Sequence, residues 1–76
     1  MNIDFVLPAN SNVIIDICNI REQHIKSLAN HDYPTGTHSV NWAGTDKNKN
    51  QVANGVYFYQ MKTDDEISSR KMLVIR

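Results

Sequence analysis

The chain has 76 residues and one cysteine, and its eight Lys and Arg side chains balance eight Asp and Glu side chains. This length makes a single domain, residues 1–76, and the zero net charge argues against a nucleic-acid-binding module or a polybasic membrane-surface segment. No apolar run approaches the ~20 residues of a transmembrane segment, and the opening residues lack the features of a signal peptide.

Short alternating stretches predict an all-β fold of six or seven strands, with no helix. In chain order, we expect strands at residues 3–7, 13–18, 24–28, 37–42, 52–61 and 67–76. Turn-forming residues separate these strands at residues 9–12, 19–23, 30–36, 43–50 and 63–66. This spacing of strands and turns is typical of a small Ig-like antiparallel β-sandwich.

The first two strands differ in their chemical patterns. The strand at residues 3–7 alternates and ends at Pro8, which is typical of an edge. The strand at residues 13–18, V-I-I-D-I-C, is apolar on both faces except at Asp16, which predicts a central position in the sheet. Cys18 cannot form an intrachain disulfide, and we interpret it as a small buried hydrophobe.

Large aromatic side chains in the second half of the chain should build the core. Tyr57, Tyr59 and Met61 share one face of their strand, and Val56, Phe58 and Gln60 share the other. We expect one of these two faces to pack against Trp42 and Val40. The Tyr57 hydroxyl either donates to an upstream backbone carbonyl, as in the tyrosine corner of Ig-type sandwiches, or belongs to an ordinary core tyrosine.

Residues 46–50, D-K-N-K-N, match the opening of a calcium-binding loop. The rest of the pattern fails, because Gln51 stands where the sharp turn needs glycine and Tyr57 stands where a bidentate glutamate is needed. The two lysines would also repel a dication. We therefore expect Asp46 and the asparagines to hydrogen-bond their own backbone, and we predict no bound cation.

The three histidines do not predict a zinc site. His24, His31 and His38 are seven residues apart, but Pro34 prevents a continuous helix that would place them on one face. Cys18 is the only soft candidate for a fourth ligand. We predict no metal and no other cofactor.

No motif predicts a catalytic centre. The chain has no G-x-S-x-G nucleophile turn and no Gly-rich phosphate loop. The carboxylates at residues 64–66 fit a solvated hairpin turn, and a sandwich of this size has little room for a ~300 Å³ substrate pocket. We expect a non-catalytic domain.

The C-terminal strand places an apolar stretch between basic ends, R-K-M-L-V-I-R at residues 70–76. Terminal charges can simply discourage edge-to-edge pairing. The same pattern also suits a strand that a partner recognises by backbone pairing and charge. The composition leaves both interpretations open.

Taken together, the motifs resemble the type A C-terminal sorting domains of the type IX secretion system. They resemble, more loosely, the Ig-like domain of the flagellar hook-capping protein. The matching pieces are F-V-L-P at residues 5–8, V-I-I-D-I at 13–17, G-T-H-S-V at 36–40 with Trp42, G-T-D at 44–46, G-V-Y-F-Y at 55–59, and K-M at 71–72 with Arg76. By this resemblance, the structural residues of the family pattern are Gly36, Trp42, Gly44, Asp46, Gly55 and Tyr57.

The chain also departs from the family pattern. Cys18 replaces a usual tyrosine, and Asn54 replaces the serine before Gly55. Glu22 and Lys49 stand where the family often has turn glycines. If these two positions require positive φ, each replacement costs about 1 kcal/mol or more.

The resemblance implies an address signal excised from the end of a larger secreted protein. Such domains are exported through the periplasm to the cell surface or medium, are recognised by the outer-membrane translocon, and are often removed by a sortase-like protease. The linked cargo domain would lie upstream. On this basis we expect the recognised residues to be Lys71, Met72, Leu73, Val74, Ile75 and Arg76.

Two alternatives remain at this point. A structural or adhesive Ig-like domain would only space or join other parts of an extracellular protein. A carbohydrate-binding module would need exposed aromatic side chains, and only Tyr33, beside Pro34 in a predicted loop, fits that requirement.

Overall fold

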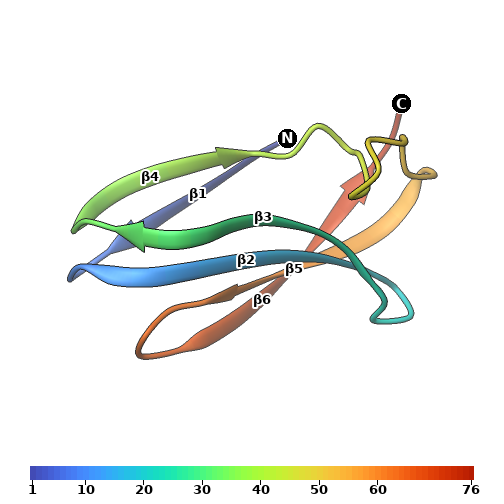
Figure 1. The fold of residues 1–76 in the computed structure, drawn as a ribbon. Coiled ribbons are helices and arrows are strands. Elements are labelled where there is room, and N and C mark those ends of the chain that lie inside the picture. Colours follow the sequence, from blue (N-terminus) through green and yellow to red (C-terminus); the bar gives the residue numbers. More distant parts are fainter.

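The computed structural model describes all of residues 1–76 and contains six strands and no helix, hence no transmembrane helix. The strands are β1 (Asn2–Leu7), β2 (Ser11–Asn19), β3 (His24–Tyr33), β4 (Gly36–Asn41), β5 (Gly55–Lys62) and β6 (Ile67–Val74). Figure 1 shows β1 and β4 forming one layer over the second layer, which contains the other four strands. The predicted all-β sandwich is confirmed.

Every pairing between strands is antiparallel. The larger sheet has the order β3-β2-β5-β6, and the smaller sheet contains only β1 and β4. The predicted central strand is therefore β2, which pairs with β3 on one side and β5 on the other. Its Val13, Ile15 and Ile17 side chains face the core, while Ile14 and Asp16 lie on the outer face.

Two predicted boundaries are wrong by three or more residues, and the other strand ends differ by at most two. β3 continues to Tyr33 through residues predicted as a loop, because β2 begins at Ser11 and supplies pairing partners as far as that tyrosine. β5 begins only at Gly55, and residues 52–54 belong to the preceding loop. The Val52 N–H donates to the carbonyl of Gly44 at 3.0 Å, which folds this part of the chain back onto the loop.

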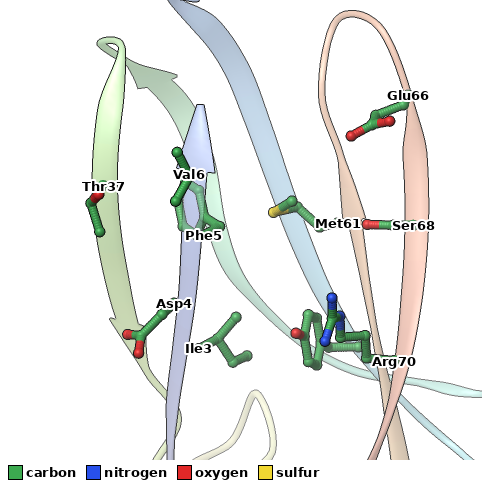
Figure 2. Close-up of a pocket in the computed structure, with 10 residues that line it drawn as sticks. Ile3, Asp4, Phe5, Val6, Thr37, Met61, Glu66, Ser68 and Arg70 are labelled. Carbon is green, nitrogen blue, oxygen red and sulfur yellow. The ribbon is translucent and has the colours of Figure 1, made fainter. Parts of the chain in front are cut away.

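The two sheets differ in width, so the two-stranded sheet leaves part of the inner face of the four-stranded sheet uncovered. β1 pairs only with β4, and β6 pairs only with β5, so each strand has a free edge. Between these strands lies an open groove of about 420 Å³, which Tyr59 and Met61 also line. Figure 2 shows β1 on one side of the groove and the β5–β6 hairpin on the other.

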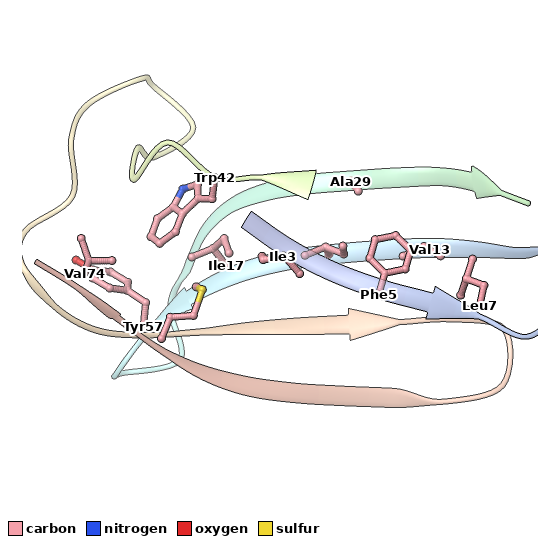
Figure 3. Close-up of a cluster of buried hydrophobic side chains, with 11 residues drawn as sticks. Ile3, Phe5, Leu7, Val13, Ile17, Ala29, Trp42, Tyr57 and Val74 are labelled. Carbon is pink, nitrogen blue, oxygen red and sulfur yellow. The ribbon is translucent and has the colours of Figure 1, made fainter. Parts of the chain in front are cut away.

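The core lies between the sheets and contains eleven buried hydrophobic residues (Figure 3): Ile3, Phe5, Leu7, Val13, Ile15, Ile17, Ala29, Trp42, Tyr57, Met72 and Val74. The Trp42 indole, which is 1% exposed, follows β4 and meets the Tyr57 ring of β5 edge-on, with 5.7 Å between ring centroids. The prediction that one face of this strand packs against Trp42 is confirmed, and the structure shows that it is the face with Tyr57. Tyr59 and Met61, on the same face, are only partly buried.

Two turns contain non-glycine residues in the left-handed region. Glu22 has φ of 64° and Lys49 has φ of 68°, and these are the positions where the related sequence pattern has glycine. For a residue with a Cβ, this conformation costs roughly 1–2 kcal/mol. Both turns therefore contain local strain that the surrounding hydrogen bonds must offset.

Replacing Lys49 with glycine should relieve this strain. We expect Lys49→Gly to raise the free energy of unfolding by up to about 1 kcal/mol, after allowing for the larger entropy of glycine in the unfolded chain. Thermal unfolding monitored by circular dichroism measures the change. Lys47→Gly is the matched control, because Lys47 is an exposed lysine of the same loop without positive φ. If Lys49→Gly and Lys47→Gly changed the free energy of unfolding equally, the proposed strain at Lys49 would be contradicted.

Candidate site at the C-terminal strand and its supporting loop

The side chains of residues 71–76 divide into an inner and an outer set. Met72 and Val74 are buried in the core, so a partner cannot reach their side chains without unfolding the strand. Lys71, Leu73 and Ile75 are exposed, and the two apolar side chains are 58% and 73% accessible. We name these three residues the outer face of the C-terminal segment.

Arg76 holds the end of the chain against the loop between β4 and β5. Its guanidinium donates hydrogen bonds to the carbonyl oxygens of Gly44 and Val52. Its backbone N–H donates to Oδ1 of Asn54 at 3.2 Å. These contacts fix the position of residues that follow the last strand, and we name them the Arg76 contacts.

The loop itself is stabilised by Asp46. One carboxylate oxygen accepts hydrogen bonds from the N–H groups of Asn48 and Asn50 at 2.9 and 3.0 Å. The backbone N–H of Asp46 donates to the Asn50 carbonyl at 2.8 Å. The prediction that the Asp46 side chain bonds its own loop is confirmed. The predicted bonds from the Asn48 and Asn50 side chains do not form, because these two residues contribute only backbone groups to the loop.

Two buried aromatic side chains donate hydrogen bonds to the same loop. The Trp42 indole N–H donates to the carbonyl of Thr45 at 2.9 Å. The Tyr57 hydroxyl donates to the carbonyl of Ala53 at 2.7 Å, four residues upstream. The tyrosine-corner interpretation is therefore correct, and both ends of the loop are fixed by core residues.

Most of the residues in the sequence pattern meet at this end of the molecule. Gly44 has φ of 74°, and a Cβ there would collide with the Arg76 guanidinium, so glycine permits the Arg76 contacts. Gly55, with φ of 151°, begins β5 beside the same loop. Gly36 does not join this group, because it pairs with Leu7 at the opposite end of the smaller sheet.

The histidines do not gather, and no three His, Cys, Asp or Glu side chains lie together as metal ligands would. His31 and His38 instead flank Tyr33, with ring centroids at 4.0 and 4.9 Å. Tyr33 also meets Phe5 edge-on at 5.3 Å. Contrary to prediction, Tyr33 is not a free loop side chain, because it lies at the end of β3 and is partly buried against these rings.

Contrary to prediction, Cys18 is only partly buried, because it lies on the outer face of β2, opposite His24 of β3. The His24 ring lies 3.3 Å from the Asp16 carboxylate. Burial raises the pKa of the Cys18 thiol, and the negative charges of Asp16 and Glu22 raise it further. The thiol is therefore protonated at neutral pH and is a poor nucleophile.

Sequence patterns did not indicate the Arg76 contacts or the approach of Asn54 to the chain end. The C-terminal arginine and Gly44 each belonged to a recognised motif, but the motifs are about thirty residues apart in the chain. Only the fold places the β4–β5 loop beside the end of β6. Covariation between residues 44 and 76 would be the sequence signal for this contact.

The raised thiol pKa predicts slow alkylation of Cys18. The iodoacetamide reaction rate should reach its half-maximum at higher pH in the folded protein than in the urea-unfolded chain, because only the thiolate reacts. Because the folded state binds this proton more tightly, stability should fall as pH rises from the unfolded thiol pKa through the folded one. Cys18→Ala should lack that fall. Equal midpoints in the two states would contradict the prediction.

Removing the guanidinium should loosen the loop. We expect Arg76→Gln to lower the free energy of unfolding by about 1 kcal/mol, because the Gly44 and Val52 carbonyls lose their charged donor. Urea denaturation measures the change. Arg70→Gln is the matched control, because Arg70 is an exposed arginine of β6 whose side chain forms no hydrogen bond within the chain. This replacement should change the free energy of unfolding by no more than about 0.5 kcal/mol. If Arg76→Gln lowered the free energy of unfolding no more than Arg70→Gln does, a stabilising role of the Arg76 contacts would be refuted.

Comparison with known proteins identifies one family. The model of the FlgD Ig-like domain matches residues 1–66, which include β1 to β5 and the hairpin turn. Neither the curated proteins nor the solved structures searched gave a match. The family agrees with the six-stranded antiparallel sandwich and with the Tyr57 hydrogen bond typical of Ig-type folds. The chain therefore belongs to the FlgD Ig-like domain family.

Proposed function

We propose that this Ig-like domain is a non-catalytic sorting module of type IX secretion. It would direct a covalently linked upstream cargo domain through the periplasm and across the outer membrane to the cell surface or medium. Its partners would be the outer-membrane translocon and a sortase-like protease. The proposal rests on the resemblance of the sequence motifs, including Lys71, Met72 and Arg76.

The observation that carries this proposal is the exposed, positionally fixed outer face of the C-terminal segment. Leu73 and Ile75 are among the most exposed large apolar side chains of the chain, and Lys71 adds a positive charge beside them. Their backbone is fixed by β5 on one side and by the Arg76 contacts at the end. A partner that recognised this face would therefore meet a rigid surface and lose little conformational entropy on binding.

The division of residues 71–76 into a buried inner set and an exposed outer set narrows the list of residues that a translocon would contact. Met72 and Val74 contribute to the core, so their role in the proposed signal is to hold the strand in register. Lys71, Leu73 and Ile75 would make the direct contacts. Deletion of residues 71–76 would remove both sets at once and would confuse loss of folding with loss of recognition.

A second candidate is an Ig-like spacer or adhesion module of a multidomain extracellular protein. The family match favours it, because that match ends at residue 66 and does not include the segment on which the sorting proposal depends. A spacer needs only the sandwich and would tolerate any exposed residue at positions 71, 73 and 75.

A reporter fusion separates the two candidates. The domain is fused behind a secreted fluorescent protein in a bacterium with type IX secretion, and surface fluorescence is measured for Leu73→Ser and Ile67→Ser. Both residues are exposed apolar side chains of β6, at 58% and 59% accessible, but Ile67 lies outside the proposed segment.

We expect Leu73→Ser to reduce surface reporter roughly tenfold, since burying a leucine against a partner contributes about 1.5–3 kcal/mol. Ile67→Ser should leave it unchanged. Urea denaturation of both purified domains checks that folding is intact. Normal surface delivery of the Leu73 variant would refute recognition through this face, and normal delivery of a fusion without the domain would favour the spacer.

A further inference from the structure

The free edge of β1 carries unused backbone hydrogen-bonding groups. The backbones of Met1 and Trp42 exchange hydrogen bonds at 2.7 and 2.9 Å, which sets the register of the pair. Because these bonds alternate along an antiparallel pair, the backbone groups of Asn2, Asp4 and Val6 point away from β4. They face the groove side of the small sheet, where no strand of this chain pairs with them.

The inner face of the β5–β6 hairpin is also uncovered beside that edge. Alternation places Ser68 and Arg70 on the same face of β6 as the buried Met72, yet both are exposed. In the neighbouring strand, Met61 and Tyr59 pair with them and are only partly buried. The inner face is therefore packed near the loop end of the molecule and open near the hairpin end.

The open groove is lined by charges of both signs. Asp4 and Glu66 supply carboxylates and Arg70 supplies a guanidinium, and none of the three forms an ion pair within the chain. Figure 2 shows Glu66 near the hairpin turn and Arg70 further along β6, with Met61 and Ser68 between them. Glu66 and Arg70 are four residues apart in extended chain, which places their Cα atoms about 13 Å from each other.

We infer that the groove binds an extended peptide segment of another protein as an added strand on the free edge of β1. Alternate side chains of this peptide face the groove: an acidic residue opposite Arg70, a small apolar residue over Met61, and a basic residue opposite Glu66. Backbone pairing supplies affinity and the alternate side chains supply specificity, as in other strand-addition sites. The inference does not rest on the proposed sorting role.

The size of the groove favours a single extended segment over a second copy of the domain. About 420 Å³ is available between β1 and β6, which suits the side chains on one face of a short strand. In a folded copy, β1 already directs Ile3, Phe5 and Leu7 into its own core. A free peptide has no core of its own, so it can place the side chains of one face in the groove.

The probe is the peptide acetyl-Thr-Glu-Thr-Val-Thr-Lys-Thr-amide, titrated into the isotope-labelled 76-residue domain and followed by amide chemical shifts and hydrogen exchange. We expect saturable shifts, with slower exchange at Asn2, Asp4 and Val6. A peptide with Gln in place of Glu and Lys should bind about 2- to 5-fold more weakly for each lost ion pair. Arg70→Gln should remove the preference for the Glu-containing peptide.

Two neighbouring serines give a matched pair of variants. Ser68→Phe fills the groove and should weaken binding at least roughly tenfold, as expected when two or more backbone hydrogen bonds are prevented. Ser69→Phe places the same ring on the opposite face of β6 and should leave binding unchanged. Because both serines are exposed, neither variant should prevent folding, which circular dichroism checks.

Several results would overturn the inference. These are no saturable binding at millimolar peptide, shifts confined to β3 or to the outer face of β6, or equal weakening by Ser68→Phe and Ser69→Phe. Concentration-dependent dimerisation through β1 that Ser68→Phe abolishes would show that the occupant of the groove is a second copy of the domain and not a peptide.

Discussion

The packing of Trp42 against Tyr57 is the contact on which the rest of the structure depends. The indole follows β4 of the small sheet, and the phenol ring comes from β5 of the large sheet, so one aromatic pair joins the two layers. Both side chains also donate hydrogen bonds to the β4–β5 loop. Truncating a buried tryptophan typically costs about 3–5 kcal/mol. A domain of this size has a total stability of only about 4–11 kcal/mol.

This contact gives the molecule a closed end and an open end. At the closed end, the loop, the Arg76 contacts and the aromatic pair fix the last residues of the chain. At the open end, the two-stranded sheet is too narrow to cover the β5–β6 hairpin, which leaves the groove beside β1. The two proposed binding surfaces follow from this asymmetry: the outer face of the C-terminal segment and the groove do not share side chains.

Much of the fold could be predicted, because the central position of β2 and the burial of Trp42 follow directly from the pattern of apolar residues. The cost of losing glycine at positions 22 and 49 was also predictable from the resemblance, and both residues have positive φ. The β3 boundary could not be predicted from composition, because pairing with β2 overrode the turn-forming residues before Tyr33. The Arg76 contacts and the groove depend on how distant segments meet, which no local pattern records.

Hydrogen exchange along β6 tests most directly whether the C-terminal segment is a fixed surface. The segment is held in this account by pairing with β5 and by Arg76, so the Met72 and Val74 amides should exchange at rates close to those of β2. Protection of those amides, reduced in Arg76→Gln, is the predicted result. Exchange of residues 71–76 at the rate of an unfolded chain, while β2 stays protected, would contradict the account.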